Sequence, residues 1–102
     1  MTLGIHFWEI DNGEVEPDLL IDIRTDEQFQ RARIPGAVSL PYTRFQAEAE
    51  ALTRSVPLVL VIDAEGARAA EMAVWLNARG ATAQYLIDGM SGWRGPLEQG
   101  GT

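Results

Sequence analysis

Five consecutive aliphatic residues in the middle of the chain, Leu58-Val59-Leu60-Val61-Ile62, constrain the fold more than any other segment. A strand with one face in water alternates apolar and polar side chains, whereas a strand that is apolar at every position needs cover on both faces. Strands of that kind are typical of parallel sheets that lie between layers of helices. The segment therefore predicts the central strand of an α/β domain.

Shorter apolar runs and helical patterns alternate around this strand. We expect further strands over residues 5–10, 18–23 and 82–87, and a short strand after the turn at Pro35-Gly36. Helices are expected from Thr25, over 41–54 and over 68–79, with Thr25 and Gln28 forming a capping box. The buried helix positions are expected at Phe45, Ala49, Leu52, Ala69, Ala73 and Leu76. This order predicts an α/β fold with a mostly parallel central sheet of about five strands, flanked by helices in three layers.

The length of 102 residues fits one domain, which we expect to span residues 1–102, with residues 98–102 as a frayed tail. Fifteen acidic residues face eight arginines and no lysine, a net charge of −7, which argues against binding to nucleic acid or to an anionic membrane. No segment is long and apolar enough to span a membrane, and no secretory signal is visible, so the expected compartment is the cytoplasm.

The absence of cysteine restricts the chemistry further. The chain cannot form a disulfide, a thiolate metal site or a cysteine nucleophile, and its single histidine, His6, cannot make a histidine cluster. We therefore expect no metal site and no cofactor. Ligands of parallel sheets bind at the carboxyl ends of the strands. The loop after the central strand, residues 63–68, is therefore the expected place for a site.

Four segments, in order along the chain, resemble sequence motifs of the rhodanese-like family. Asp22-Ile23-Arg24 is similar to the family's D-x-R, and Arg33-Ile34-Pro35-Gly36-Ala37 is similar to H-I-P-G-A, with arginine in place of histidine. Residues 58–68 are similar to V-x-x-Y-C-x-x-G-x-R, and residues 86–93, with Gly89 and Trp93, are similar to L-x-G-G-x-x-x-W. The resemblance implies a rhodanese-like fold. Because few residues separate 10 from 18, it also implies that the family's first helix is reduced or missing.

The resemblance places Asp63 where the family has its catalytic cysteine, because Gly66 and Arg68 match the glycine and arginine of the loop. In the family, that cysteine takes up a sulfane sulfur as a persulfide, and the loop amides and the next helix stabilise its thiolate. A carboxylate cannot form a persulfide. The resemblance therefore implies an inactive loop, Asp63-Ala64-Glu65-Gly66-Ala67-Arg68. In that loop we expect Asp63 to fill the anion cradle, Arg68 to add a charge-assisted bond to it, and Glu65 to repel anions.

Several functions remain open at this point. The leading hypothesis is a catalytically inactive domain that acts as a binding or regulatory module for an unidentified protein partner, or for a second copy of itself through an apolar patch at Val74 and Trp75. One alternative is a metal-dependent hydrolase or phosphatase in which Asp63 acts with Glu65. Another is the silent partner subunit of a sulfurtransferase. We expect structural roles for the remaining motif residues: Asp22, Arg24, Pro35, Gly36, Gly89 and Trp93.

Overall fold

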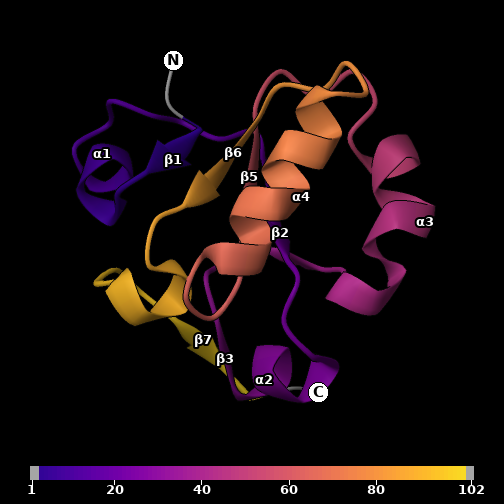
Figure 1. Ribbon diagram of the computed structural model, residues 1–102. Helices are drawn as coiled ribbons and strands as arrows, with labels where there is room; N and C mark the ends of the chain where they lie inside the picture. Colours follow the sequence, from indigo (N-terminus) through magenta and orange to yellow (C-terminus); the bar gives the residue numbers. More distant parts are fainter. Residues whose placement is uncertain (1–2, 101–102) are drawn as a thin grey trace.

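The computed structural model describes residues 3–100 and is built around one five-stranded parallel sheet (Figure 1). The strands lie in the order β1-β6-β5-β2-β4 and every neighbouring pair is parallel. Their bounds are β1 Gly4–Ile5, β2 Leu19–Asp22, β4 Val38–Ser39, β5 Val59–Ile62 and β6 Ala83–Leu86. The predicted α/β class and the five-stranded parallel sheet are confirmed. No helix among the described residues is long and apolar enough to cross a membrane.

β5 is the central strand, as its aliphatic sequence predicts. All four of its residues are fully buried. Val59 and Val61 belong to the hydrophobic cluster on one face of the sheet, and Leu60 and Ile62 belong to the cluster on the other face. Because side chains alternate along a strand, β5 contributes to both clusters, and a polar residue at any of these four positions would be buried.

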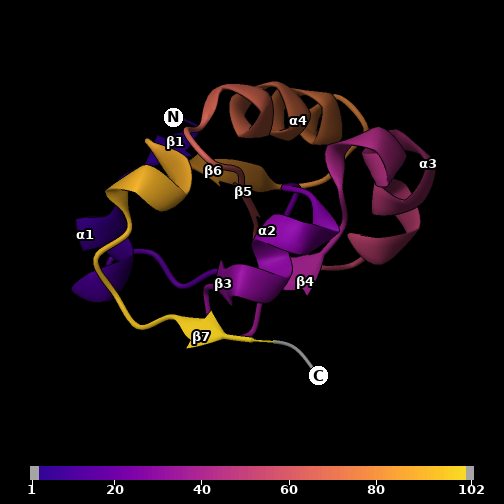
Figure 2. The ribbon, with the colours of Figure 1, turned by 90° about the horizontal axis from the view of Figure 1, so that it is seen from below.

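The helices form layers on both sides of the sheet (Figure 2). Helices α3 (Tyr42–Leu52) and α4 (Ala67–Asn77) cover one face, to which they contribute Phe45, Ala49, Ala69, Met72, Ala73 and Leu76. Helix α1 (Phe7–Asp11) and the 3-10 helix η1 (Gly89–Gly92) lie on the other side. Helix α2 (Asp26–Arg31) follows β2 at the carboxyl ends of the strands.

Two local predictions about turns and caps are confirmed. The Thr25 hydroxyl accepts the amide of Gln28, and the Gln28 side chain accepts the amide of Thr25, so α2 begins at a complete capping box. At Pro35-Gly36 the amide of Ala37 donates to the carbonyl of Ile34 at 3.1 Å, and Gly36 has a φ of 85°. Proline followed by a left-handed glycine is the pattern of a type II turn, which leads here into β4.

The prediction of a strand over residues 5–10 is wrong beyond Ile5, because Phe7–Asp11 form α1. Two apolar positions three residues apart fix this helix: the Phe7 ring packs edge-on against Trp93 at 4.8 Å, and Ile10 packs on the second cluster. The Glu9 carboxylate accepts the His6 amide at 2.7 Å, which closes the first turn. A helix of five residues is therefore present near the start of the chain, where the family resemblance implied that the first helix is reduced or missing.

Two further expectations need correction. Helix α3 ends at Leu52, which is 38% exposed, and the buried residue at this end is Thr53, whose hydroxyl donates to the Ala49 carbonyl at 2.8 Å. The expected frayed tail is ordered at Glu98–Gln99, which form β7 and pair antiparallel with β3 (Ala32–Arg33). Arg33 fastens this pair, because it lies 3.6 Å from the Glu98 carboxylate and donates to the Gly100 carbonyl at 2.7 Å. Residues 101–102 of the expected tail lie outside the described residues.

Candidate functional site

The loop between β5 and α4 folds around the carboxylate of Asp63. Its Oδ2 accepts the amides of Arg68 at 2.9 Å and Ala69 at 3.0 Å, and its Oδ1 accepts the amide of Gly66. Gly66 has a φ of 103°, a conformation that favours glycine, and it precedes the first residue of α4. Asp63 is 8% exposed. The ring of amides expected to hold an anion is therefore occupied by a side chain of the same loop.

This arrangement follows from the chemistry of helix ends. The first amides of α4 have no partner inside the helix, and the helix dipole makes that end electropositive. A carboxylate there satisfies three donors at once and gains about 0.3–1 kcal/mol from the dipole alone. Bonds from amides to a charged acceptor are also about twice as strong as neutral ones. Asp63 thus stabilises the loop and the beginning of α4 together.

Gly89 packs closely against the backbone of the loop. Its φ is 54°, and a Cβ at this position would lie 2.7 Å from the carbonyl carbon of Ala64. The adjoining amides of Met90 and Ser91 donate to the carbonyls of Asp63, at 2.9 Å, and Ala64, at 3.1 Å. Residues 89–91 therefore pack directly against the loop backbone, and their two hydrogen bonds fix its conformation. Only glycine at position 89 allows so close an approach.

Asp22 and Arg24 form a closed pair beside the site. Asp22 is fully buried, and its carboxylate accepts the Arg24 side chain at both oxygens, from Nε at 3.0 Å and from Nη2 at 2.8 Å. The second bond of Nη2 goes to the carbonyl of Ala32 at 2.7 Å. This pair links the end of β2 to the start of β3. The carboxylate and the guanidinium thus neutralise each other.

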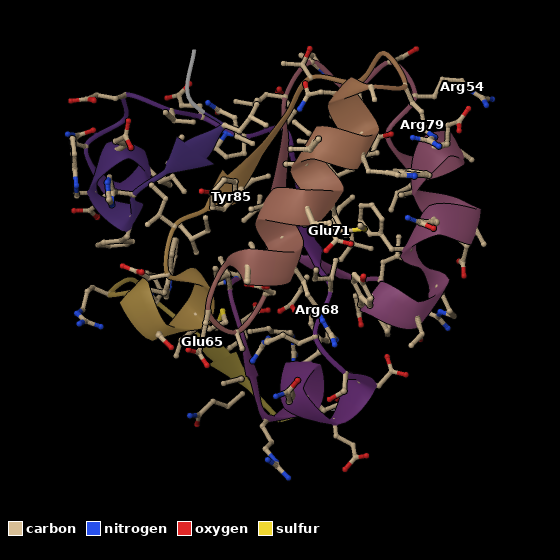
Figure 3. All side chains as sticks on the ribbon, viewed as in Figure 1. Arg54, Glu65, Arg68, Glu71, Arg79 and Tyr85 are labelled. Atoms are coloured by element: carbon tan, nitrogen blue, oxygen red, sulfur yellow. The ribbon has the colours of Figure 1, made fainter. Side chains whose placement is uncertain are left out.

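Arg68 differs from the prediction, because its backbone amide and not its guanidinium binds Asp63. The guanidinium lies over the ring of Tyr42, 4.5 Å from its centroid. The Tyr42 hydroxyl donates to Glu71 at 3.0 Å, and this bond, together with the charge of Glu71, raises the pKa of Tyr42. Glu65 is exposed at the outer side of the loop (Figure 3). Sequence reasoning missed Tyr42, because its contact with Arg68 joins two helices that lie far apart in the chain.

A pocket of about 340 Å³ opens beside the occupied loop. Apolar groups of Ile23, Pro41 and the Tyr42 ring form part of its wall, and Thr25 and Arg68 add polar groups. Asp63 borders the pocket, but both of its oxygens bind amides. Among residues 3–100 no group of three or more histidine, aspartate or glutamate side chains is arranged to hold a metal ion. The pocket is therefore suited to a ligand that contacts Arg68 and an apolar wall.

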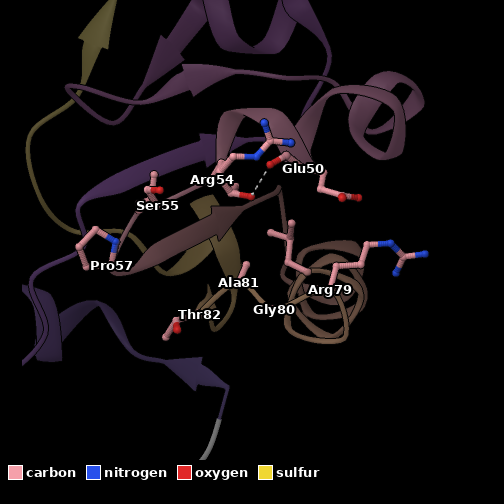
Figure 4. A pocket seen from close by; sticks show the side chains of 11 residues that line it. Glu50, Arg54, Ser55, Pro57, Arg79, Gly80, Ala81 and Thr82 are labelled. Atoms are coloured by element: carbon pink, nitrogen blue, oxygen red, sulfur yellow. Dashed lines mark hydrogen bonds between the residues drawn. The ribbon is translucent and has the colours of Figure 1, made fainter.

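A second hollow, of about 430 Å³, lies at the opposite end of the sheet between the carboxyl ends of α3 and α4 (Figure 4). Arg54 and Arg79 border it, well away from Glu65 and Arg68 (Figure 3). The Arg79 guanidinium stacks on the Trp75 ring at 3.8 Å and donates to the Trp75 carbonyl at 3.2 Å. A cation at the carboxyl end of a helix is favourable. The helix ends are thus a sufficient reason for Arg54 and Arg79 to lie here, and no ligand is needed to explain them.

Comparison with known proteins relates this architecture to one family. The model of the rhodanese-like domain family matches residues 9–96. A crystal structure of a rhodanese-like domain protein from Staphylococcus aureus is 27% identical, with a TM-score of 0.83, over 99% of this chain and 100% of that one. A structure from Staphylococcus saprophyticus, at 24% identity and a TM-score of 0.82, covers 96% and 99% and shows the same fold.

A thiosulfate sulfurtransferase from Pseudomonas aeruginosa is also similar, with 27% identity and a TM-score of 0.75. The match covers 98% of this chain but only 20% of that enzyme, so this chain corresponds in length to one segment of it. No curated protein matches the sequence. The family match over residues 9–96, the parallel sheet and the loop at its carboxyl edge agree with one another, and the chain belongs to the rhodanese-like domain family, of which it is a member without cysteine.

Proposed function

We propose that this chain is a non-catalytic rhodanese-like domain that acts by binding a protein partner. The partner would bind the surface around the loop of residues 63–68, which we call the loop face. Sulfur transfer in the family requires a thiolate that attacks a sulfane sulfur, releases sulfite from thiosulfate, and passes the sulfur on from a persulfide. The sequence has no cysteine to carry out any of these steps. A carboxylate oxygen forms no such reversible bond with sulfur.

One observation carries the proposal: the Asp63 carboxylate accepts the amides of Gly66, Arg68 and Ala69. These donors are the groups that an incoming anion would need. A thiosulfate dianion at the same place would also meet the charge of Asp63, and two like charges 4 Å apart repel by about 1 kcal/mol even in water. The loop therefore keeps its shape and loses its capacity for anions, which favours a role as a fixed surface.

Thiocyanate formation from thiosulfate and cyanide tests the non-catalytic part of the proposal. We expect the purified wild-type protein to give no thiocyanate above the rate of a protein-free blank. The Asp63→Ser variant is the matched control, since it removes the charge without supplying sulfur, and it is also expected to be inactive. Turnover by the wild-type protein would refute the proposal.

The Asp63→Cys variant tests whether the amides still act as an anion cradle. Because they would stabilise a thiolate as they stabilise the carboxylate, we expect the pKa of this thiol to lie below the ordinary cysteine value of about 8.5. The pH dependence of alkylation by iodoacetamide measures it. The control is Ala47→Cys, at an exposed position in the middle of α3. If both thiols titrate alike, the amides do not form a cradle.

A further inference from the structure

An exposed aromatic hollow lies at the other edge of the sheet, where β1 and α1 meet β6 (Figure 1). We call it the aromatic hollow. It has a volume of about 550 Å³, and the described residues that line it are Leu3, Gly4, His6, Trp8, Glu9, Tyr85 and Ile87. Trp8 is 54% exposed, although an indole ring is among the side chains that gain most from burial. This edge is separate from the loop of residues 63–68, to which the proposed function belongs.

The packing of α1 fixes the direction of Trp8. Phe7 and Ile10 hold the inner side of this helix against Trp93 and the second core cluster. Trp8, which lies between them in sequence, cannot share their side of the helix and projects outward. The His6 ring stacks on the indole at 5.8 Å with an angle of 12° between the planes. The indole therefore has one ring neighbour in an offset stack and leaves most of its surface open.

Gly4 gives the hollow its second aromatic wall. A Cβ at this position would lie 2.9 Å from the Tyr85 ring, so the absence of a side chain lets that ring lie against β1 (Figure 3). Tyr85 and Trp8 thus come from different elements and border the same space. Aromatic rings carry negative potential on their faces, so the exposed Trp8 indole is a favourable contact for a cation.

The charged side chains that lie near α1 in the sequence are acidic. Glu9 borders the hollow, and the exposed side chains of Asp11, Glu14, Glu16 and Asp18 follow it in the chain. No lysine or arginine precedes Arg24, and the whole chain carries a net charge of −7. A second copy of this chain would bring the same negative charge, and a nucleic acid would bring phosphates. The occupant that the field favours is cationic.

The protein itself shows how its aromatic faces are covered elsewhere. Arginine guanidiniums lie over three rings: Arg79 over Trp75 at 3.8 Å, Arg68 over Tyr42 at 4.5 Å, and Arg33 over Phe29 at 5.3 Å. In the described part of the chain no arginine or lysine lies over Trp8. We propose that the aromatic hollow binds an arginine side chain from a basic segment of a partner protein, which stacks on Trp8 beside the carboxylates of α1.

Nuclear magnetic resonance of the three indole N–H groups tests this proposal. The probe is a five-residue peptide of alternating glycine and arginine with blocked ends, compared with its glutamate counterpart. We expect the arginine peptide to shift the Trp8 signal saturably, and less so as salt rises. The Trp93 signal, whose Nε1 donates to the Pro96 carbonyl at 3.0 Å, should stay in place. An unmoved Trp8 signal, or an equal shift with the glutamate peptide, would overturn the proposal.

Variants separate the indole from the acidic charges. Trp8→Ala should lower the affinity for the arginine peptide about two- to fivefold. Because this variant lacks the indole signal, binding is followed on the amide signals of Gly4 and Tyr85. Asp11→Asn should lower the affinity for the same peptide about twofold at low salt. Val74→Ala, which removes an exposed apolar side chain from α4, is the control and should bind as the wild type does. The proposal would be contradicted if Trp8→Ala bound the peptide with wild-type affinity. It would also be contradicted if the Trp8 signal moved with protein concentration alone, because a second copy would then fill the hollow.

Discussion

Replacement of Asp63 by asparagine is the most direct test of the physical account of the loop. The change keeps the size of the side chain and removes its charge and one of its two acceptor oxygens. In the wild type Oδ2 serves the amides of Arg68 and Ala69, and Oδ1 serves that of Gly66. Asparagine must therefore turn a donor NH₂ toward at least one backbone N–H group, and one buried amide loses its acceptor.

The expected loss of stability follows from these three bonds. A hydrogen bond to a charged group contributes about 1.5–3 kcal/mol, and a neutral one about 0.5–1.5 kcal/mol. If the remaining oxygen faces Arg68 and Ala69, two bonds weaken to neutral strength and the bond to Gly66 is lost. Allowing for the fact that the bonds share one carboxylate and are not additive, we expect a loss of about 3 kcal/mol. That is a large fraction of the roughly 5–15 kcal/mol typical of a whole domain.

Urea unfolding followed by tryptophan fluorescence measures this loss. With a slope of about 1.5 kcal/mol per molar urea, a change of about 3 kcal/mol lowers the midpoint by about 2 M. Asp18→Asn is the matched control, because this aspartate is exposed, and its variant should stay within about 0.5 kcal/mol of the wild type. If Asp63→Asn is no more destabilising than Asp18→Asn, the carboxylate does not hold the loop.

Two further predictions test the neighbours of the loop. Gly89→Ala should lower the stability of the fold by more than about 3 kcal/mol, or prevent folding, because its Cβ would meet the Ala64 backbone. Gly36→Ala is the control: Gly36 also has a positive φ, of 85°, but open space around it, so the loss should be about 1–2 kcal/mol. Thermal unfolding measures both variants. Tyr42 should titrate above the ordinary tyrosine value of about 10, because its bond to Glu71 raises its pKa, and Glu71→Ala should lower that pKa. The folded state then holds this proton more tightly, so the stability that this bond contributes is complete below pH 10 and is lost as pH rises through the raised pKa. Absorbance at 295 nm, with Tyr42→Phe as the reference, measures the titration.

The sequence predicts those elements whose signals are local and long. The aliphatic segment 58–62 and the periodic helices 41–54 and 68–79 correspond to β5, α3 and α4 within two residues at most at each end. The N-terminal strand was wrong beyond Ile5, because a short run of aromatic and aliphatic residues suits a strand and a buried helix turn equally well. The choice there depends on the contact of Phe7 with Trp93, far along the chain. The β3–β7 pair has two residues in each strand, too few for any periodicity.

The same distinction applies to the site. The position of the Asp63 side chain within its loop could be predicted, because Asp63, Gly66 and Arg68 lie within six residues and the bonds run to backbone amides at the beginning of a helix. The direction of the Arg68 guanidinium could not, since Tyr42 competes for it from another helix. Backbone geometry near a helix end is set by the local sequence, whereas a long side chain takes whichever partner the tertiary fold brings closest.

The bonds of Asp63 also account for an ordered loop in a domain that has no cysteine. A loop that offers several amides to an anion is unstable when empty, because buried donors without partners cost free energy. An alanine at position 63 would leave that cost in place, whereas aspartate supplies the missing anion as a permanent part of the chain. A carboxylate at this position therefore stabilises the loop, and under the proposed function it stands in the place of a sulfur nucleophile. A loop that is ordered without a ligand presents a constant surface, and a constant surface is what a binding module requires, since little ordering entropy is lost when the partner arrives.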